Sequence, residues 1–484
     1  MSFIEREASS VSDDEAIINL KETIALQKNE FIKNPFPSLD QRLELIGALA
    51  NMMIQYRTKI HEALDADFHG HPTQFADLVE CLGVAGRAGY VAENLAEWMK
   101  PQMRFAEPAV FGTGKAYIQY QPKGVIGNMV PWNFPFDVGL GPLVEMLAAG
   151  NRAIVKPSDL VPACGELTLE MVNATFDRDQ VAVVIGGIEL SKAFSTLQWD
   201  HLMYTGGIEV GRSVAVAAAQ NLTPVTLELG GKNPALIADD NLIRSTVETV
   251  IGCKMIKNGQ MCTSPDYVMV SEGKTREFSE IVKEIINEAM PEYTLNAHTT
   301  GIINGRHLNR LMEYVDDAKS KGATIVEIGG KPDRKTLKMP FTLVLNPTED
   351  MKIMQNEIFG PILPVKTYKT IDEAVGYINS HERPLGVYFY TQDATLGEKV
   401  KHSTVSGGFC LNVAAAHSAL PSLGFGGIGS SGIGRHHGIE GFLEFSNPRG
   451  VFERGEDDLI ASFFPPYGDL ANAVIAGALG EGDA

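Results

Sequence analysis

The chain has 484 residues, of which 44% are hydrophobic and 21% are charged, a balance typical of a packed protein with room for roughly three domains. Its formal net charge of −19 disfavours nucleic acid or an anionic membrane as the main partner, and no apolar run is long enough for a membrane helix. Five widely spaced cysteines without a CxxC pair, and an acidic stretch at residues 1–7 without a signal-peptide pattern, predict reduced thiols and a cytoplasmic location.

The first hundred residues have the periodicity of helices. Between residues 14 and 100, apolar side chains recur at helical spacing, as in residues 42–49. Pro101 ends this pattern, and residues 116–121 then alternate like a strand with one solvated face. We expect that strand to form an edge hairpin or an arm that reaches another subunit.

From Gly124 onwards, short apolar runs alternate with helical segments. This order predicts parallel sheets covered by helices on both faces, because parallel strands need crossover connections. The first unit has expected strands at 125–130, 153–155, 181–185 and 201–204, and expected helices at 138–149, 163–176 and 208–219. The second has expected strands at 267–270, 342–345, 362–365 and 387–390, and expected helices at 274–290, 305–321 and 371–379. The weakly patterned tail after about residue 456 is expected to be a surface or interface extension.

A helical run ends at Gly259 and presents Cys262 just past its end. A thiol in this place is a candidate nucleophile. A small buried residue that closes a helix is the structural alternative. The other four cysteines fall within helical or strand-like runs and are interpreted as packing residues: Cys81, Cys164, Cys253 and Cys410.

Two polar patches directly follow predicted strands, where ligands bind in α/β sheets. Asn133, between Pro131 and Pro135, can donate an amide hydrogen bond to a developing oxyanion, or can satisfy backbone groups in a turn. In the second patch, Lys156 precedes Ser158 and Asp159, a combination that suits the hydroxyls of a ribose. A solvated loop is the alternative for the second patch.

Glycines mark two further patches. Gly206 and Gly207 separate a strand from a helix, where backbone N–H groups can approach a phosphate. The GxGxxG fingerprint is absent there; it occurs at 424–429, but only a poor strand precedes it, so a glycine-rich loop is the better interpretation. Glu228 lies in an apolar run before two glycines, so that desolvation would raise its pKa and make it a usable general base. A buried glutamate with a structural partner is the alternative.

Seven motifs in one order resemble the NAD(P)-dependent aldehyde dehydrogenase superfamily, from about residue 40 to residue 450. They are Pro131–Asn133, Lys156–Ser158, Thr205–Gly211, Glu228–Lys232, Gly259–Cys262, Glu357–Pro361 and Ser431–Arg435. Within the superfamily the chain is most similar to the class 3-like branch, and there to bacterial coniferyl aldehyde dehydrogenases. That finer resemblance is carried by residues 221–228, 265–267 and 434–438.

The resemblance implies oxidation of an aldehyde to the carboxylic acid with reduction of NAD, NADP being possible. Cys262 would attack the aldehyde as a thiolate, and the Asn133 amide with the backbone N–H of Cys262 would hold the oxyanion. Hydride would pass to the nicotinamide and leave a thioester. Glu228 would activate the water that releases the acid.

The resemblance also implies a cofactor site and no metal. Lys156 would hold the adenosine ribose and Glu357 the nicotinamide ribose, with Phe359 against the nicotinamide end. The complete set of expected cofactor-binding residues is Val130, Pro131, Trp132, Lys156, Ser158, Asp159, Gly186, Gly206, Gly207, Val210, Leu229, Glu357 and Phe359.

Three positions depart from the usual residues of the superfamily. Asp159 stands where a Glu commonly grips the ribose 2′-hydroxyl, and its shorter side chain can leave room for a 2′-phosphate. NAD over NADP is therefore only the favoured expectation. Gly207 replaces a common Ser, which removes a hydroxyl contact, and Asn356 replaces a common acid before Glu357.

The predicted fold class is α/β, with two doubly wound parallel-sheet domains, one for the cofactor and one for catalysis, and a small β oligomerisation arm. The dinucleotide-binding domain is expected to comprise residues 1–103, 124–229 and 413–441, and the catalytic domain residues 230–412. Residues 104–123 and 442–484 would form the arm and the C-terminal tail. The resemblance implies a homodimer, or a tetramer, with these segments at the interface.

The helix after Asn133 should line the substrate tunnel. Asp137, Val138 and Gly141 lie about one and two turns on from Asn133, and a glycine at 141 suggests a roomy tunnel for an aromatic aldehyde, such as coniferyl aldehyde, or a long hydrophobic one. Helix packing at a small residue is the alternative for Gly141.

Three other functions compete with this one. A CoA-acylating relative would typically lack the base that Glu228 provides. A binding protein on the same fold would have lost the chemistry. A thiol hydrolase would need a histidine base, and none of the 11 histidines falls in a patch that can be tied to Cys262.

Overall fold

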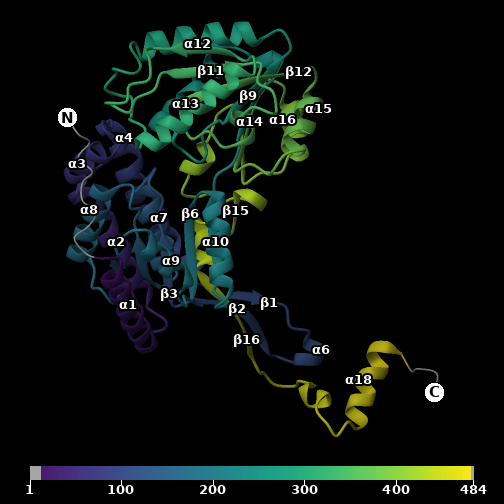
Figure 1. Ribbon diagram of the computed structural model, residues 1–484. Helices are drawn as coiled ribbons and strands as arrows, with labels where there is room; N and C mark the ends of the chain where they lie inside the picture. The colour runs from purple at the N-terminus through teal and green to yellow at the C-terminus, as the bar shows by residue number, and fades with distance from the viewer. Residues whose placement is uncertain (1–11, 481–484) are drawn as a thin grey trace.

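The structure is a computed structural model that describes residues 12–480, and it has the α/β class predicted from the sequence. Within these residues the strands form sheets of six, seven and three strands (Figure 1). The prediction that residues 1–7 form no signal sequence concerns residues outside the described range. The same holds for the first residues of the predicted dinucleotide-binding domain and the last residues of the predicted C-terminal tail.

The N-terminal helices form a layer beside the six-stranded sheet, as Figure 1 shows. They are α1 (Asp13–Lys33), α2 (Leu39–Gln55), α3 (Arg57–Phe68), α4 (Thr73–Phe75), the π-helical turn η1 (Ala76–Cys81) and α5 (Leu82–Trp98). Helices α1 and α2 start at capping boxes: Ser12 with Glu15, and Ser38 with Gln41. In each box two otherwise unpaired backbone donors are satisfied, which fixes where the helix begins.

The six-stranded sheet has the order β15-β7-β6-β3-β4-β5 and is parallel apart from β15. Its strands are β3 (Val125–Met129), β4 (Arg152–Lys156), β5 (Val181–Val183), β6 (His201–Gly206), β7 (Val225–Leu229) and β15 (Gly432–Ile433). Its remaining helices are α7 (Asp137–Ala148), α8 (Pro162–Thr175), α9 (Ile188–Thr196), α10 (Ile208–Ala219) and α17 (Gly438–Glu444).

Successive side chains of these strands enter two different cores. In β4, Ala153 and Val155 pack in the core with α2, α5, α7 and α8, whereas Ile154 packs with α1, α9 and α10. Because strand side chains alternate, a parallel strand covered on both faces must be apolar throughout. The predicted doubly wound arrangement is confirmed. Helix α9 was not predicted from the sequence.

The seven-stranded sheet has the order β10-β11-β12-β9-β8-β13-β14 and is parallel apart from β10. Its strands are β8 (Pro234–Ile237), β9 (Tyr267–Ser271), β10 (Thr324–Ile328), β11 (Phe341–Leu345), β12 (Ile362–Tyr368), β13 (Gly386–Tyr390) and β14 (Gly408–Leu411). Its helices are α11 (Arg244–Met255), α12 (Thr275–Ala289), α13 (Gly305–Ser320), α14 (Lys352–Gln355), α15 (Ile371–Asn379) and α16 (Ala394–Ser403). The chain enters this unit after β7 and returns in β15, which pairs with β7.

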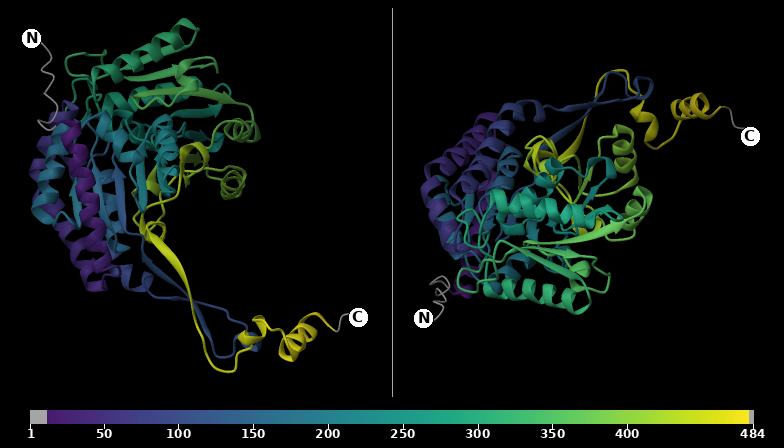
Figure 2. Two further views of the ribbon diagram at one scale, coloured as in Figure 1. Left: turned by 60° about the horizontal axis from the view of Figure 1, so that its bottom comes forward. Right: turned by 90° about the horizontal axis from the view of Figure 1, so that it is seen from above.

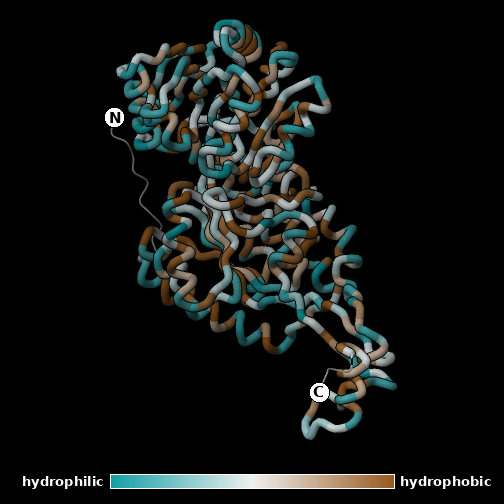
Figure 3. The backbone as a smooth tube through the Cα atoms, turned by 90° about the vertical axis from the view of Figure 1, so that its right-hand side faces the viewer, coloured by the Kyte–Doolittle hydropathy of each residue, from teal (hydrophilic) through white to brown (hydrophobic). Residues whose placement is uncertain are grey.

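A three-stranded antiparallel sheet and the C-terminal tail project from the body of the molecule (Figures 1 and 2). The sheet consists of β1 (Gln102–Arg104), β2 (Lys115–Pro122) and β16 (Ser446–Glu453), and the tail contains α18 (Asp469–Leu479); the short helices α6 (Pro108–Phe111) and η6 (Ile460–Phe463) lie nearby. The strand expected at 116–121 is present as β2, while β16 and α18 were not predicted. Apolar stretches of the tail are brown in Figure 3, and Phe464, Tyr467 and Leu479 are exposed.

The glycine-rich loop was predicted correctly, whereas the end of the helix before Cys262 was not. Residues 424–429 contain no strand and belong to a glycine-rich loop, as inferred. The helical run before Cys262 ends at Met255, four residues earlier than expected, because Lys257 and Asn258 adopt left-handed backbone conformations. No helix within residues 12–480 is both long and apolar enough to cross a membrane.

Candidate active site

A cavity of about 460 Å³ lies at the carboxyl ends of the strands of the six-stranded sheet and faces the seven-stranded unit. All predicted site residues except Gly186 line it. They come from the ends of β3, β4, β6 and β7, from the first turn of α10, from the loop that carries Cys262, and from the loop that carries Glu357 and Phe359. We call this cavity the groove.

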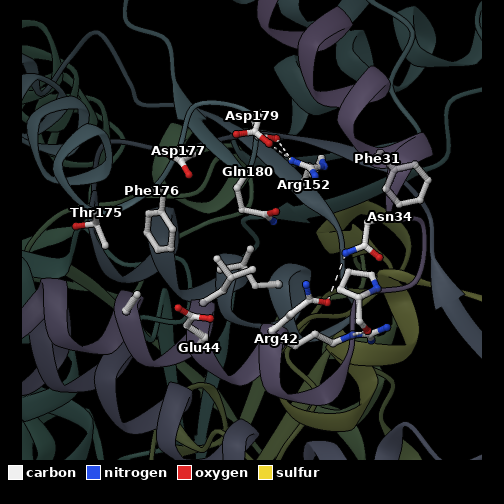
Figure 4. Close-up of a pocket in the computed structure, with 16 residues that line it drawn as sticks. Phe31, Asn34, Arg42, Glu44, Arg152, Thr175, Phe176, Asp177, Asp179 and Gln180 are labelled. Carbon is white, nitrogen blue, oxygen red and sulfur yellow. Dashed lines mark hydrogen bonds and ion pairs between the residues drawn. The ribbon is translucent and has the colours of Figure 1, made fainter.

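Gly186 lies in a neighbouring cavity of about 380 Å³. This cavity shares Ser158 and Asp159 with the groove, so the two are adjacent. A further cavity, of about 390 Å³, lies at the amino ends of β4 and β5, on the opposite edge of the sheet (Figure 4). There Arg152 pairs with Asp179 at 2.7 Å, and none of the predicted site residues takes part.

The loop that presents Cys262 follows three consecutive left-handed residues. Lys257, Asn258 and Gly259 have φ values of 48°, 57° and 76°. A side chain at Gly259 would collide with the backbone carbonyl of Gly360, so this turn requires glycine. The turn at Gly259 packs against Gly360, so the cysteine loop and the loop that carries Glu357 are in direct contact.

Amide side chains hold the cysteine loop in place. Nε2 of Gln260 donates to the carbonyl oxygens of Lys257 and Gly301, both at 2.9 Å, and its Oε1 accepts from the N–H of Ile303 at 2.9 Å. The Asn233 amide donates to the carbonyl oxygen of Cys262 at 2.7 Å. These buried hydrogen bonds fix the backbone of the candidate nucleophile.

Asn133 is buried next to the cysteine loop. Its Nδ2 donates to the carbonyl oxygen of Gln260 at 3.2 Å. The adjacent Trp132 packs against Phe359 and His307, with ring centroids 5.3 and 5.4 Å apart. The Asn133 amide therefore contacts the cysteine loop two residues before Cys262, and both Asn133 and Cys262 line the groove. An oxyanion donor must lie in such a position.

Glu228 is buried in β7, with 2% of its surface exposed. Its Oε1 has no hydrogen-bond partner among the described residues. Burial raises the pKa of Glu228 well above its ordinary value, although the Arg435 guanidinium and a backbone N–H of Gly427 act in the opposite direction. A free carboxyl oxygen with a raised pKa is suited to proton transfer.

Cys262 is half-buried. Burial raises the pKa of its thiol well above the ordinary value, and the carboxylates of Glu228 and Glu357 raise it further. Burial likewise raises the pKa of Glu357 to about 8, with Asp266 adding to the rise. The protein surroundings therefore favour the neutral forms of these three groups, and a nearby positive charge would promote their ionisation.

Glu357 and its loop are held by neighbouring segments of the same unit. Its Oε1 accepts from the N–H of Gly231 at 3.2 Å. Lys232 forms an ion pair with Asp266 and donates to the carbonyl oxygen of Asn356 at 3.0 Å. Asp266 in turn accepts from the N–H of Ile358 at 2.9 Å, so the residues on both sides of Glu357 are fixed.

The groove has the features that a dinucleotide needs. Lys156 is buried, and burial lowers the pKa of its amine. Within the part of the chain that the structure describes, the amine donates one hydrogen bond, to the Pro157 carbonyl oxygen at 3.1 Å. Oγ1 of Thr205 is buried without a partner among the described residues. Gly207 begins α10 with open space where a side chain would lie, which leaves the helix N-terminus accessible.

Several groove residues are not among the site residues predicted from the sequence. They are Met129, Leu160, Ser191, Tyr204, Thr205, Gly230, Arg306, His307 and Arg310. Arg306 and Arg310 lie in the first turns of α13, where their one-turn spacing was a usable signal. Cations near a helix start are ordinarily solvated, however, so the pattern alone could not place them in a site.

The expectation that Gly141 opens a roomy tunnel is not supported. An ideal Cβ at Gly141 would lie 2.8 Å from Nη1 of Arg87, and Gly141 does not line the groove. Arg87 is itself fixed by hydrogen bonds to Glu145, of 2.7 Å from its Nε, and by His436 at 3.1 Å. The glycine thus provides space for a buried arginine, which is the packing alternative; of the three helix residues, only Val138 borders the groove.

The sequence pattern of the aldehyde dehydrogenase family matches residues 25–451, and the chain belongs to this family. It is similar to a probable coniferyl aldehyde dehydrogenase of Pseudomonas aeruginosa, with 41% identity over 452 residues that cover 93% of this chain and 94% of the relative. It is also similar to a coniferyl aldehyde dehydrogenase of a Pseudomonas species, with 36% identity over 446 residues, which cover 91% and 92%.

Solved structures agree with this assignment. Staphylococcus aureus AldH in a substrate-bound state has a TM-score of 0.88 and 30% identity, covering 95% of this chain and 99% of that one. A Mycobacterium tuberculosis aldehyde dehydrogenase complexed with NAD+ has a TM-score of 0.81 and 25% identity, covering 91% and 90%. The chain is an oxidoreductase that oxidises an aldehyde to the acid with reduction of NAD or NADP, as the motifs implied.

Proposed function

We propose that this aldehyde dehydrogenase acts on an aromatic aldehyde such as coniferyl aldehyde, or on a long hydrophobic one. Relatives with coniferyl aldehyde dehydrogenase in their names are 36–41% identical to it and align with 91–97% of its length. The apolar part of the groove, with Trp132, Val138 and Phe359, is compatible with a ring.

The observation that carries the mechanism is that Cys262, Glu228 and Asn133 line one cavity. Sγ of Cys262, as the thiolate, bonds to the aldehyde carbon. The carbonyl oxygen becomes an oxyanion, which accepts hydrogen bonds from the Asn133 amide and the backbone N–H of Cys262. A bound nicotinamide would supply the acceptor for the hydride of this carbon, and loss of the hydride would leave a thioester on Sγ of Cys262.

Glu228 then takes a proton from the water whose oxygen attacks the thioester carbon. The carbon–sulfur bond breaks and the carboxylic acid leaves. Oε1 of Glu228 is buried and has no hydrogen-bond partner within residues 12–480, which supports release by water rather than transfer to the thiol of CoA. The same three side chains argue against a non-catalytic binding protein.

We propose that the cofactor lies along the groove between Lys156 and Cys262. Lys156, Ser158 and Asp159 hold the adenosine ribose, and Glu357 binds the nicotinamide ribose beside Phe359. The pyrophosphate lies near the start of α10 at Gly206 and Gly207. The remaining predicted contacts are Val130, Pro131, Trp132, Val210, Leu229 and, from the adjacent cavity, Gly186.

The domain division and the assembly are part of the proposal. The six-stranded unit (1–103, 124–229 and 413–441) binds the cofactor, and residues 230–412 form the catalytic unit. Residues 104–123 and 442–484 form an arm that pairs two chains into a cytoplasmic homodimer. The exposed aromatic side chains Phe105, Phe464 and Tyr467 support an interface there, because water disfavours such a group of apolar surfaces.

A panel of aldehydes tests the substrate and the chemistry together. Aromatic and aliphatic aldehydes, short and long, are each assayed with NAD and with NADP for cofactor reduction and acid formation. We expect the highest kcat/KM for aromatic or long aldehydes, and no acid from the Cys262→Ala variant, which should still bind cofactor. Turnover by Cys262→Ala would contradict the assigned nucleophile, and the Cys253→Ala variant serves as the matched control. A preference for short aliphatic aldehydes would contradict the substrate class.

A further inference from the structure

Asp13, the first residue of α1, caps a helix that is distant in sequence. Its Oδ1 accepts from the N–H of Gly187 at 2.6 Å, and its Oδ2 accepts from the N–H groups of Glu189 at 3.0 Å and Leu190 at 3.3 Å. These donors belong to the first turn of α9, which has no side-chain cap from its own N-cap residue. Helices α1 and α9 lie side by side in Figure 1 and pack in one core.

The capping carboxylate occupies a place that would otherwise favour a phosphate. The first N–H groups of a helix are unpaired, and the positive end of the helix dipole stabilises an anion there. Because the Asp13 carboxylate accepts hydrogen bonds from the first N–H groups of α9, these donors are not free to bind a phosphate. The position where an anion would bind instead carries a fixed negative charge.

This carboxylate borders the cavity next to the adenosine end of the groove. Asp13 lines the cavity of about 380 Å³ that shares Ser158 and Asp159 with the groove. An ideal Cβ on Gly186 would lie 2.7 Å from Oδ1 of Asp13, so the carboxylate lies directly against this glycine. Asp13 and Asp159 also act on buried Lys156, where both raise its pKa against the effect of burial.

The charges around this cavity have one sign. Its lining contains the carboxylates of Asp13, Asp159 and Glu166, and no Lys, Arg or His from residues 12–480. A 2′-phosphate on the adenosine ribose carries a charge near −2, as phosphate monoesters do around pH 7. Lys156, in the adjoining groove, already faces two of these carboxylates.

We propose that Asp13 is a cofactor-specificity residue: its carboxylate at the start of α9 disfavours the 2′-phosphate of NADP, so that the enzyme prefers NAD. This inference rests on the proposed adenosine site at Lys156, Ser158 and Asp159. It opposes the expectation from Asp159 alone, whose short side chain leaves room for a phosphate. Space is present, but the charge beside it has the wrong sign.

The test removes the charge and leaves a neutral acceptor at position 13. In Asp13→Ser the hydroxyl oxygen can accept a hydrogen bond but has a shorter reach than the carboxylate, so the ratio of the two cofactors in the same variant is compared rather than a single rate. The matched control is Asp14→Asn, which removes one carboxylate from the same helical turn at an exposed position. Wild type and both variants are assayed for kcat/KM with NAD and with NADP, at low salt to limit screening.

We expect Asp13→Ser to raise the ratio of kcat/KM for NADP to that for NAD by about tenfold or more, since like charges placed together are costly. The Asp14→Asn ratio should stay within about twofold of wild type, as should its kcat/KM with NAD. An unchanged NADP-to-NAD ratio in Asp13→Ser would overturn the inference.

Calorimetric binding separates this inference from the proposed reaction. Adenosine 2′,5′-bisphosphate and 5′-AMP probe the 2′ position without any aldehyde. Asp13→Ser should gain affinity for the bisphosphate relative to 5′-AMP, and Asp14→Asn should not. If no aldehyde is oxidised with either cofactor, the proposed function fails, and the binding ratio alone still decides the role of Asp13: an unchanged ratio overturns it.

Discussion

Nζ of Lys257 lies 2.8 Å from Oε1 of Glu80, and both side chains are fully buried. The other carboxyl oxygen of Glu80 accepts from the N–H groups of Phe136 and Asp137 at 3.1 and 2.8 Å. One carboxylate therefore joins the turn before Cys262 to the segment just after Asn133. The relative position of the nucleophile and the amide donor depends on this buried pair.

Removing one partner should destabilise the fold. In Glu80→Ala the Lys257 ammonium stays buried without its counter-charge, which costs about 3–5 kcal/mol when a buried pair is broken. Denaturant unfolding monitored by circular dichroism measures this loss. Glu97→Ala breaks the exposed pair of Glu97 with Lys100 and should cost less than about 1 kcal/mol. Equal losses in the two variants would contradict the structural role of Glu80.

Replacing Asn133 by alanine should slow the reaction without removing the cofactor. One oxyanion donor is lost, and losing such a donor lowers kcat by about 10²–10³-fold. Steady-state kinetics measure kcat, and fluorescence titration measures cofactor affinity, which should change little. A kcat within about threefold of wild type would exclude the Asn133 amide as an oxyanion donor.

Glu228→Gln should stop the reaction after one turnover. The thioester forms and one equivalent of reduced cofactor appears as a burst, but release of the acid slows by about 10²–10⁴-fold without the base. Rapid-mixing absorbance at the reduced-cofactor band measures both phases. In the wild type, acid release should accelerate as the pH rises, because the base acts only after losing its proton and its pKa is raised. A full steady-state rate in the variant would contradict the assigned base.

Ionisation of the Asp137 carboxyl group should lower the free energy of unfolding as the pH rises. Burial, and the carboxylate of Glu80, raise its pKa from 3.8 to about 7 in the folded chain. The folded state therefore holds a proton that the unfolded state releases above pH 3.8, and the associated stability is lost as the pH passes 7. Asp137→Asn should unfold at a higher temperature than wild type at pH 8.5, with a smaller difference at pH 5.5. Asp316→Asn, at an exposed position, should show no such trend; a parallel trend would exclude the effect of Asp137.

Two glycine-to-alanine changes on helices should have opposite effects. At Gly141 the new methyl group would lie 2.8 Å from Nη1 of Arg87, which is fixed by Glu145 and His436, so the crowding should cost about 1–3 kcal/mol. Gly86 in α5 has open space around it, and alanine there should stabilise the helix by about 0.5–1 kcal/mol. Thermal unfolding measures both changes. A stabilised Gly141→Ala would show that the arginine can move away.

The groove could be predicted because its residues follow a topological rule. Val130, Lys156, Gly206 and Leu229 end or directly follow neighbouring strands, and such ends meet at one edge of a parallel sheet. The order of the motifs along the chain then assigned Cys262 to the same site, although no feature of its own segment places it at this edge of the sheet. The alternating apolar runs also sufficed for both doubly wound sheets.

Other features depend on contacts between residues that are distant in sequence. Glu80 and Lys257 are 177 positions apart, and each looks like a surface charge in its own segment. Asp13 caps α9 from 174 residues away. The helix before Cys262 ends early because tertiary hydrogen bonds hold Lys257 and Asn258 in left-handed conformations, whereas local propensity would continue it.

The seven-stranded unit is inserted between two strands that lie next to each other. The chain leaves the six-stranded sheet after β7 and re-enters it in β15, where Gly432 pairs with Glu228. The proposed base in β7 therefore lies beside both the exit from the six-stranded sheet and the return to it. The backbone that supports Glu228 is paired on both sides, with Thr205 of β6 and with Gly432 of β15, which fixes the carboxylate at the junction of the two units.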